Sequence, residues 1–183
     1  MNDPMDGTND ATRSLAAELR LRPLGRSPVA RGIRWFAGSR FGAWLLAPTL
    51  RHLDRGMLWL TRGRTTFSNG LAGTPTLFLT TTGARTGRPR TAQLIAVRAG
   101  ADLAVIGSNF GRAAAPGWVA NLLADPSATA SYRDRSARVR ARELTGAEAE
   151  AVWAAGRRLY RGFSTYPAMA AGRPIRVFVL DLT

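Results

Sequence analysis

The sequence contains no cysteine and a single histidine, His52, among its 183 residues. Without cysteine the chain has no disulfide, no thiolate nucleophile and no cysteine-ligated metal. One histidine leaves neither a Ser-His-Asp constellation nor a multi-histidine metal site. We therefore expect no metal centre, and we expect a chemistry that does not depend on an activated side-chain nucleophile.

Lysine is also absent, so all 26 basic residues are arginines, set against 12 acidic residues for a net charge of +14. We attribute the arginine-only usage to genome composition. The absence of lysine excludes a lysine Schiff base and a P-loop lysine. The positive charge is spread along the whole chain, and such a surface attracts nucleic acid, anionic lipid or a small acidic molecule. Charge alone does not choose among the three.

Long hydrophobic runs are missing. The longest uncharged apolar run, residues 41–50, contains Pro48 and has about half of the roughly 20 residues that cross a bilayer. Residues 1–12 are polar and acidic, which predicts no secretory leader and a cytoplasmic location. An apolar stripe fits a helix packed on the domain, with a helix lying on the anionic inner face of the membrane as the alternative. Its members are Leu50, Leu53, Met57 and Leu60.

Three regions are expected: a disordered or loosely ordered segment at 1–28, a helical region at 29–62 and one domain at 63–183. We expect Ser14 or Thr12 to cap a short helix in the first region, and Thr145 with Glu148 to form a capping box in the last. Strand patterns alternate with turn residues, which favours antiparallel hairpins in an α+β, barrel-like sheet over βαβ units. The expected strands are 76–82, 91–97, 102–108, 127–132, 136–145 and 175–182, with helices at 117–125 and 145–161.

The turn between the first two predicted strands carries three arginines. Gly83 and Gly87 permit a backbone that exposes successive N–H groups to an anion. Threonine hydroxyls add donors, guanidinium forks suit phosphate or carboxylate, and a proline stiffens the exit. The alternative is an exposed basic turn without a ligand. The residues concerned are Thr81, Thr82, Arg85, Thr86, Arg88, Pro89 and Arg90.

Two further stretches carry candidate functional residues. Residues 107–123 follow a strand and open a helix, whose N-terminus offers N–H groups near Pro116. Trp118 there either stacks on a flat ring or packs in the core. Residues 159–169 hold three aromatic residues that either line a pocket for a planar acceptor or pack in the core. The remaining candidates in the two stretches are Ser108, Asn109, Gly111, Arg112, Tyr160, Phe163 and Tyr166.

Taken together, three motifs resemble the deazaflavin-dependent nitroreductase family, which uses reduced coenzyme F420 and belongs to the split β-barrel, flavin-reductase-like superfamily. The motifs are LFLTTTGARTGRPRTAQL, VIGSNFGRAAAPGWVANLLADP and LYRGFSTYP followed by RPIRVFVLDL. The resemblance covers roughly residues 50–183. It implies an antiparallel split barrel with N-terminal helices and two helices packed around the barrel.

The resemblance also implies a site. Its cofactor-binding residues are Thr82, Gly83, Arg85, Thr86, Gly87, Arg88, Pro89, Arg90, Ser108, Asn109, Phe110, Gly111, Arg112, Pro116, Trp118 and Asn121. The substrate pocket comprises Trp44, Tyr160, Phe163 and Tyr166. Ser108, Tyr160 and Tyr166 are the candidate catalytic residues. The family's coenzyme carries a phosphate and a γ-glutamyl tail, which would be the anion held by the arginine turn.

The activity implied is hydride transfer from reduced coenzyme F420, in preference to FMN, to a small planar acceptor such as a quinone, nitro or enone compound. Phe163 stands where the nitroimidazole-reducing branch has a tyrosine, and Asn109-Phe110 replaces its Lys-Gly, so nitroimidazole reduction is not expected. A non-catalytic coenzyme carrier is the alternative. We expect no nucleic-acid partner, because no helix-turn-helix pattern is present. A homodimer is left open.

Overall fold

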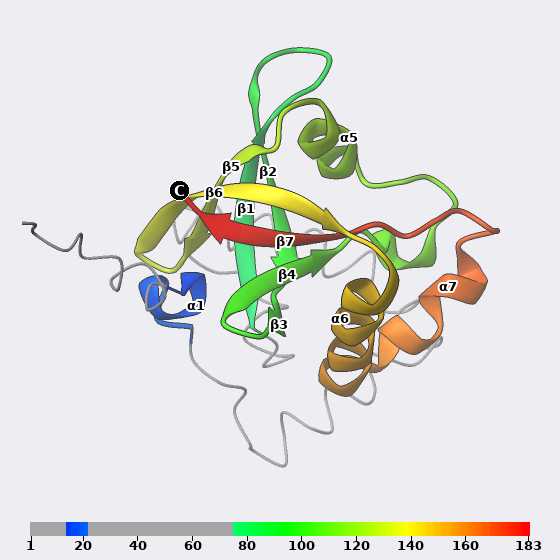
Figure 1. The fold of residues 1–183 in the computed structure, drawn as a ribbon. Helices are drawn as coiled ribbons and strands as arrows, with labels where there is room; N and C mark the ends of the chain where they lie inside the picture. The colour runs from blue at the N-terminus through cyan, green and yellow to red at the C-terminus, as the bar shows by residue number, and fades with distance from the viewer. Residues whose placement is uncertain (1–13, 22–74) are drawn as a thin grey trace, which may run out of the picture.

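The computed structural model describes residues 14–21 and 75–183 (Figure 1). The predictions made for residues 29–62, including Trp44, lie outside this part of the chain. The strands are β1 (Thr76–Thr82), β2 (Pro89–Ile95), β3 (Val97–Ala99), β4 (Asp102–Ile106), β5 (Ser127–Tyr132), β6 (Arg135–Leu144) and β7 (Val177–Leu182). The helices are α1 (Leu15–Glu18), α5 (Gly117–Ala124), α6 (Gly146–Leu159) and α7 (Tyr166–Met169), with 3-10 turns η1 (Asn109–Gly111) and η2 (Arg161–Ser164).

The seven strands form one sheet in the order β2-β1-β5-β6-β7-β4-β3, and each neighbouring pair is antiparallel. The two edge strands, β2 and β3, are separated in the chain only by Ala96. The sheet must therefore curl until its edges approach, and β2 does contact β4. Figure 1 shows the curl, with β1 and β2 running across the direction of β6 and β7. The expected antiparallel split barrel is confirmed.

The chain passes from one sheet edge to the other at Ala96, where a single strand was predicted over 91–97. The structure instead has two strands, β2 ending at Ile95 and β3 starting at Val97. The Ala96 N–H still donates to the Pro75 carbonyl at 2.8 Å, in register with the β1–β2 pairing, and the chain turns to the other sheet edge directly after it. A period-2 pattern continues through such a corner, so the sequence gives no signal for the break.

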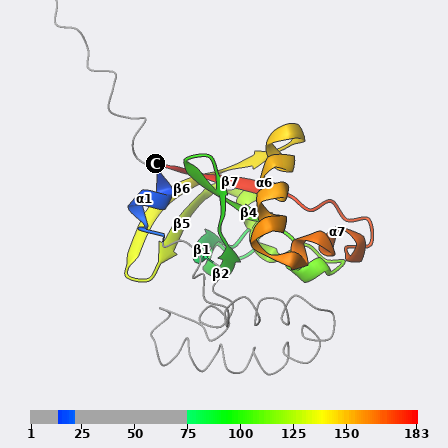
Figure 2. The ribbon, with the colours of Figure 1, turned by 90° about the horizontal axis from the view of Figure 1, so that it is seen from below.

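Two hydrophobic clusters pack against opposite faces of β7. Phe178 and Leu180 join the cluster inside the curled sheet, together with Leu77 and Leu79 of β1. Val177 and Val179 face the other way, toward α6 and the 3-10 turn η2. Burial of each large aliphatic side chain stabilises the fold by about 1.5–3 kcal/mol. Strand β7 is thus apolar on both faces, and helix α6 covers one of them (Figure 2).

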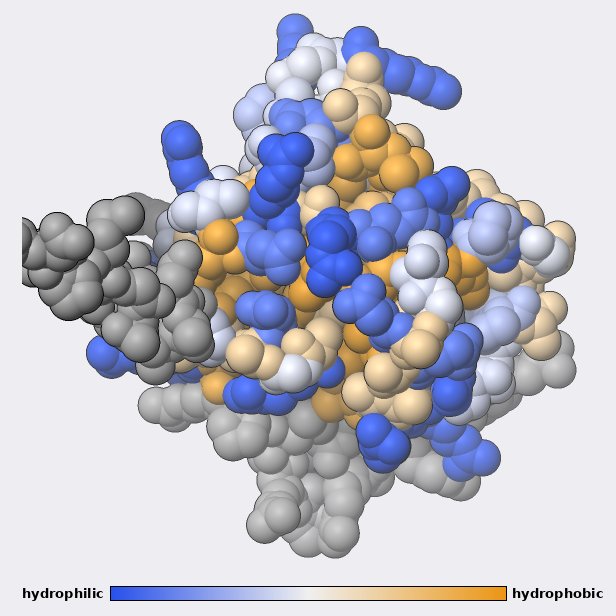
Figure 3. Space-filling view, in the orientation of Figure 1, coloured by the Kyte–Doolittle hydropathy of each residue, from blue (hydrophilic) through white to orange (hydrophobic). Residues whose placement is uncertain are grey.

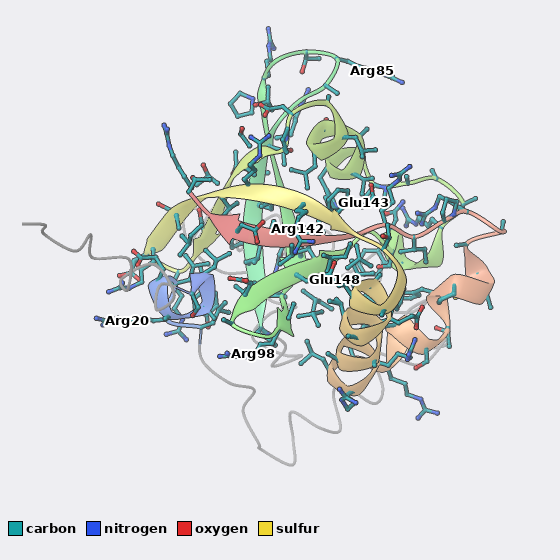
Figure 4. The ribbon with its side chains drawn as sticks, viewed as in Figure 1. Arg20, Arg85, Arg98, Arg142, Glu143 and Glu148 are labelled. Atoms are coloured by element: carbon teal, nitrogen blue, oxygen red, sulfur yellow. The ribbon has the colours of Figure 1, made fainter. Side chains whose placement is uncertain are left out.

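The predicted alternation of β6 is confirmed. Val139 and Ala141 are buried while the intervening arginines are exposed. Hydrophilic residues gather over the outer face of β6 and β7, on the side seen in Figure 3. The predicted capping box is wrong, because the Thr145 side chain makes no cap hydrogen bond. Glu148 instead accepts a hydrogen bond from Arg142 Nη1 at 3.2 Å, toward which Figure 4 shows it lying. An ion pair with the preceding strand replaces the N-cap contact.

Helix α1 packs on the core, although residues 1–28 were expected to be loosely ordered. Ser14 caps it, as predicted, and its Oγ accepts from the Ala17 N–H at 3.2 Å. Leu15 and Leu19 are fully buried in the cluster inside the sheet. Among the described helices, none is long and apolar enough to cross a membrane.

Candidate functional site

Asn121 on helix α5 fixes the arginine turn between β1 and β2. Its Nδ2 donates to Thr81 Oγ1 at 2.9 Å, and its Oδ1 accepts from the Ala84 N–H at 2.9 Å. Thr81 and Asn121 are both buried, and they are two of the three buried polar residues in the described part of the chain. The amide is satisfied at both ends within the protein. Asn121, expected among the cofactor contacts, thus holds the arginine turn against α5.

The turn itself is closed by its own backbone. Gly83 N–H donates to the Arg88 carbonyl at 2.9 Å, and the N–H groups of Thr86 and Gly87 both donate to the Gly83 carbonyl. A Cβ at Gly83 would lie 2.9 Å from Thr86 Oγ1, so glycine is needed there for close approach, whereas Gly87 has a φ of +62°. The N–H groups of Gly83, Thr86 and Gly87 therefore bond within the turn, so the side chains are the main donors that the turn offers to an anion.

The guanidinium groups of the turn point to solvent. Arg85, Arg88 and Arg90 are all exposed, and Figure 4 shows Arg85 extending away from the body of the protein. Within the described residues none of the three forms an ion pair with a carboxylate. Exposed, unpaired guanidinium forks on a braced turn provide donors suited to a phosphate or a carboxylate. Thr82, Thr86 and Pro89 are exposed around them.

The loop at 107–112 follows β4 and is held by Arg173. The guanidinium donates to the carbonyls of Gly107 (3.2 Å), Ser108 (3.0 Å) and Arg112 (3.2 and 3.3 Å). Sequence reasoning missed this residue, although it opens the RPIRVFVLDL stretch. The residues around Arg173, a glycine and a proline, do not indicate that its guanidinium bonds to backbone carbonyls about sixty residues earlier in the chain.

Ser108 is 8% exposed and lies at the start of this loop. No hydrogen bond joins its hydroxyl to the described residues, and among them no fully buried side-chain oxygen lacks a partner. The hydroxyl therefore keeps contact with the surface, where it can donate to a ligand. Asn109, by contrast, uses its Nδ2 to donate to the Ala114 carbonyl at 2.8 Å. Arg112 is exposed.

Trp118 belongs to the core. It is 7% exposed and packs edge-on against Phe178, with ring centroids 5.8 Å apart. Its indole faces the sheet interior from the first turn of α5, and Pro116 serves as the N-cap residue. Of the two alternatives for Trp118, this burial and the contact with Phe178 favour core packing.

The three aromatic residues after α6 pack together. Tyr166 donates from its hydroxyl to the Tyr160 hydroxyl at 3.2 Å. Phe163 is 3% exposed and packs edge-on against Trp153 and both tyrosines, so the structure places it in the interior and not on a pocket wall. Burial, followed by the neighbouring Tyr160 oxygen, raises the pKa of the Tyr166 phenol well above its usual range. Tyr166 therefore stays protonated at neutral pH.

Helix α5 and the 107–112 loop bring the three motifs to one side of the protein. Asn121 ties α5 to the arginine turn. A Cβ on Gly107 would lie 2.9 Å from Val119 Cγ2, so the loop lies directly against the same helix. At its far end the loop contacts the tyrosines, since the Phe110 and Tyr166 rings are 6.3 Å apart. A chain of contacts through α5 and the loop thus connects the arginine turn, the loop of Ser108 and the tyrosine pair, which together are the candidate site.

The curled antiparallel sheet and this site define a protein of the split β-barrel, flavin-reductase-like class. Residues 55–181 match the family model described as F420H2-dependent quinone reductase, and the chain belongs to this family. It is an F420-dependent oxidoreductase. A similar solved structure is described as an F420-H2 dependent reductase (FDR-A), with 30% identity, a TM-score of 0.53 and coverage of 58% of this chain and 94% of that chain. Another, described as a domain-swapped dimer, has 28% identity, a TM-score of 0.55 and coverage of 76% and 98%.

Proposed function

We propose that the protein transfers a hydride from reduced coenzyme F420 to a small planar acceptor, with quinones as the first class to test. One observation supports the proposal: contacts through α5 and the 107–112 loop connect the turn that carries the exposed arginines to Ser108 and the tyrosine pair. A cation cluster and a group of hydroxyls connected in this way suit a ligand with an anionic tail and a planar head.

The side chains of the turn fit the coenzyme's phosphate and γ-glutamyl tail. Arg85, Arg88 and Arg90 supply guanidinium donors that no carboxylate of the described chain neutralises. Asn121 fixes the turn before any ligand arrives, so less conformational entropy is lost on binding. The attraction acts over roughly 8–10 Å at physiological ionic strength, which makes coenzyme affinity sensitive to salt.

When bound, the reduced deazaflavin supplies a hydride, which is one proton with two electrons, and the reduced acceptor takes up one further proton. The protein holds that proton at the tyrosine pair. Tyr166 donates to the Tyr160 oxygen, which leaves the Tyr160 O–H free to donate outward. Tyr160 is half-buried and is therefore the better proton donor, while Tyr166 orients it and keeps its own proton. Ser108 offers a second hydroxyl to an acceptor oxygen.

The test of this function is anaerobic mixing of the protein and the reduced coenzyme with menadione, following loss of the reduced coenzyme. We expect oxidation well above the uncatalysed rate. Coenzyme binding without oxidation across quinones, nitro compounds and enones would instead identify a carrier.

The arginine turn is tested by Arg85→Gln and Arg88→Gln, each of which should weaken coenzyme binding by roughly three- to tenfold at low salt and flatten its salt dependence. Arg98→Gln is the matched control, because Arg98 is an exposed arginine on β3. Equal losses in all three variants would show that the coenzyme responds to net charge and not to the turn.

The assembly and the location of the protein remain predictions. The likeness to a structure described as a domain-swapped dimer supports a homodimer, which light scattering of the purified protein tests directly. A cytoplasmic location, with residues 29–62 attached to the inner membrane face as the alternative, is tested by cell fractionation with and without residues 29–60, a deletion that keeps α1 and its core contacts. Unchanged fractionation after the deletion excludes membrane attachment through this segment.

A further inference from the structure

Phe110 is held on the surface in a costly conformation. Its side chain is 69% exposed, the highest among the large exposed hydrophobic residues of the described chain. Its φ of 55° and that of Asn109, 48°, lie in the left-handed region, which bulky non-glycine residues rarely adopt. Two consecutive residues of this kind mark stored strain, and such strain gathers at ligand sites.

The surrounding structure imposes this conformation. Arg173 bonds to carbonyls on both sides of Phe110, and the Asn109 amide donates to the Ala114 carbonyl. Gly111 leaves no room for adjustment, because a Cβ there would lie 2.7 Å from Met169 Cβ. The clamp does not bring the Phe110 ring into the core. Its ring contact is an edge-on approach to Tyr166 at 6.3 Å, so the ring is presented outward.

We propose that Phe110 is an acceptor-selecting residue that provides the apolar wall against which a flat, uncharged acceptor ring packs. The assignment rests on the proposed function. The chemistry beside the ring agrees with it: Met169 adds a half-exposed apolar side chain, and the Tyr160 and Ser108 hydroxyls suit the carbonyl oxygens of a quinone. An apolar face bordered by a few hydroxyl donors is typical of a small-molecule site.

The experiment measures the dissociation constant of menadione by equilibrium dialysis, with the protein loaded with oxidised coenzyme. Phe110→Ala should weaken menadione binding roughly tenfold, the upper range for a lost aromatic contact. Phe110→Tyr keeps the ring and should restore binding to within about twofold. Leu123→Ala is the matched control, because Leu123 on α5 is also exposed and apolar, at 51%. The family resemblance placed Phe110 among the coenzyme contacts; if it selects the acceptor instead, coenzyme affinity, measured by fluorescence, should be the same in all three variants.

In turnover, Phe110→Ala should raise KM for menadione by the same factor and leave kcat nearly unchanged, since the ring holds the acceptor and moves no proton.

Arg173→Lys provides a second approach, because an ammonium cannot reproduce the guanidinium fork that bonds the three loop carbonyls. It should weaken menadione binding although the Phe110 ring is still present. Unchanged binding in this variant would show that Arg173 does not set the position of the ring.

The assignment is overturned if wild-type protein does not bind menadione, if Phe110→Ala binds it as well as wild type, or if Leu123→Ala loses as much. A parallel fall in coenzyme affinity would also overturn it, since Phe110 would then support the coenzyme. The proposed function fails separately: protein that binds menadione but does not oxidise the reduced coenzyme rejects the reductase activity, while dialysis still decides the role of Phe110.

Discussion

Replacement of Asn121 by alanine tests whether a buried amide sets the geometry of the arginine turn. The variant leaves the Ala84 N–H without its acceptor and deprives Thr81 Oγ1 of its donor. Ala84 is exposed, so its N–H can bond to water, whereas the buried Thr81 hydroxyl loses one partner and keeps the Arg90 carbonyl. With about 1 kcal/mol for each net hydrogen bond lost, the free energy of unfolding should fall by about 1–2 kcal/mol.

Coenzyme binding should weaken for a different reason. A turn released from α5 must be ordered again on binding, and fixing even one or two backbone residues costs about 1–2 kcal/mol each. The dissociation constant of the coenzyme should therefore rise roughly tenfold or more. Urea unfolding and fluorescence titration measure the two effects. Leu123→Ala on the same helix is the control, with an expected change in stability within about 0.5 kcal/mol.

The reasoning is refuted if Asn121→Ala unfolds more easily yet binds the coenzyme as tightly as wild type. The arginine turn would then either keep its shape without Asn121 or take no part in binding.

Two further predictions concern stability. Gly111→Ala should lower the free energy of unfolding by about 2–4 kcal/mol, because of its φ of +73° and the clash with Met169, whereas Gly117→Ala, which has open space, should leave urea unfolding nearly unchanged. Tyr166 has a raised pKa in the folded state, so it has no effect on stability below about pH 10, where both states are protonated. Above that pH the unfolded state loses its proton first, and wild-type stability should fall by up to about 1.4 kcal/mol per pH unit more steeply than that of Tyr166→Phe. Parallel curves for the two proteins between pH 9 and 11 would contradict the assigned pKa shift.

Much of the sheet could be predicted from local pattern. Strand β1 was predicted with its observed bounds, and the alternation of β6 follows from arginines spaced two apart. The corner at Ala96 was missed, because it depends on where the two sheet edges meet. Thr145 precedes α6 as predicted, but the capping box with Glu148 does not form, since Glu148 pairs with Arg142 on a strand that local pattern does not place nearby.

Short motifs carried a family resemblance and supplied the candidate site residues. That α5 connects the arginine turn to the 107–112 loop was not predicted. The role of each side chain was less predictable, because burial decides it. Trp118 and Asn121 sit three residues apart on α5, and both face inward. The spacing of two residues along a helix does not show whether their side chains contact a ligand or pack in the core. Arg173 acts through backbone carbonyls, which every residue possesses, so its partners leave no trace in the sequence.

The position of β7 bears on how the chain is made. This strand joins β6 to β4 and supplies apolar residues to both clusters, yet it comes after every other strand in the order of synthesis. Until residues 177–182 leave the ribosome, the nascent chain therefore exposes the apolar side chains of both hydrophobic clusters. Because β7 is made last, we expect chaperones to bind the chain during translation. We also expect chains that stall before this strand to aggregate.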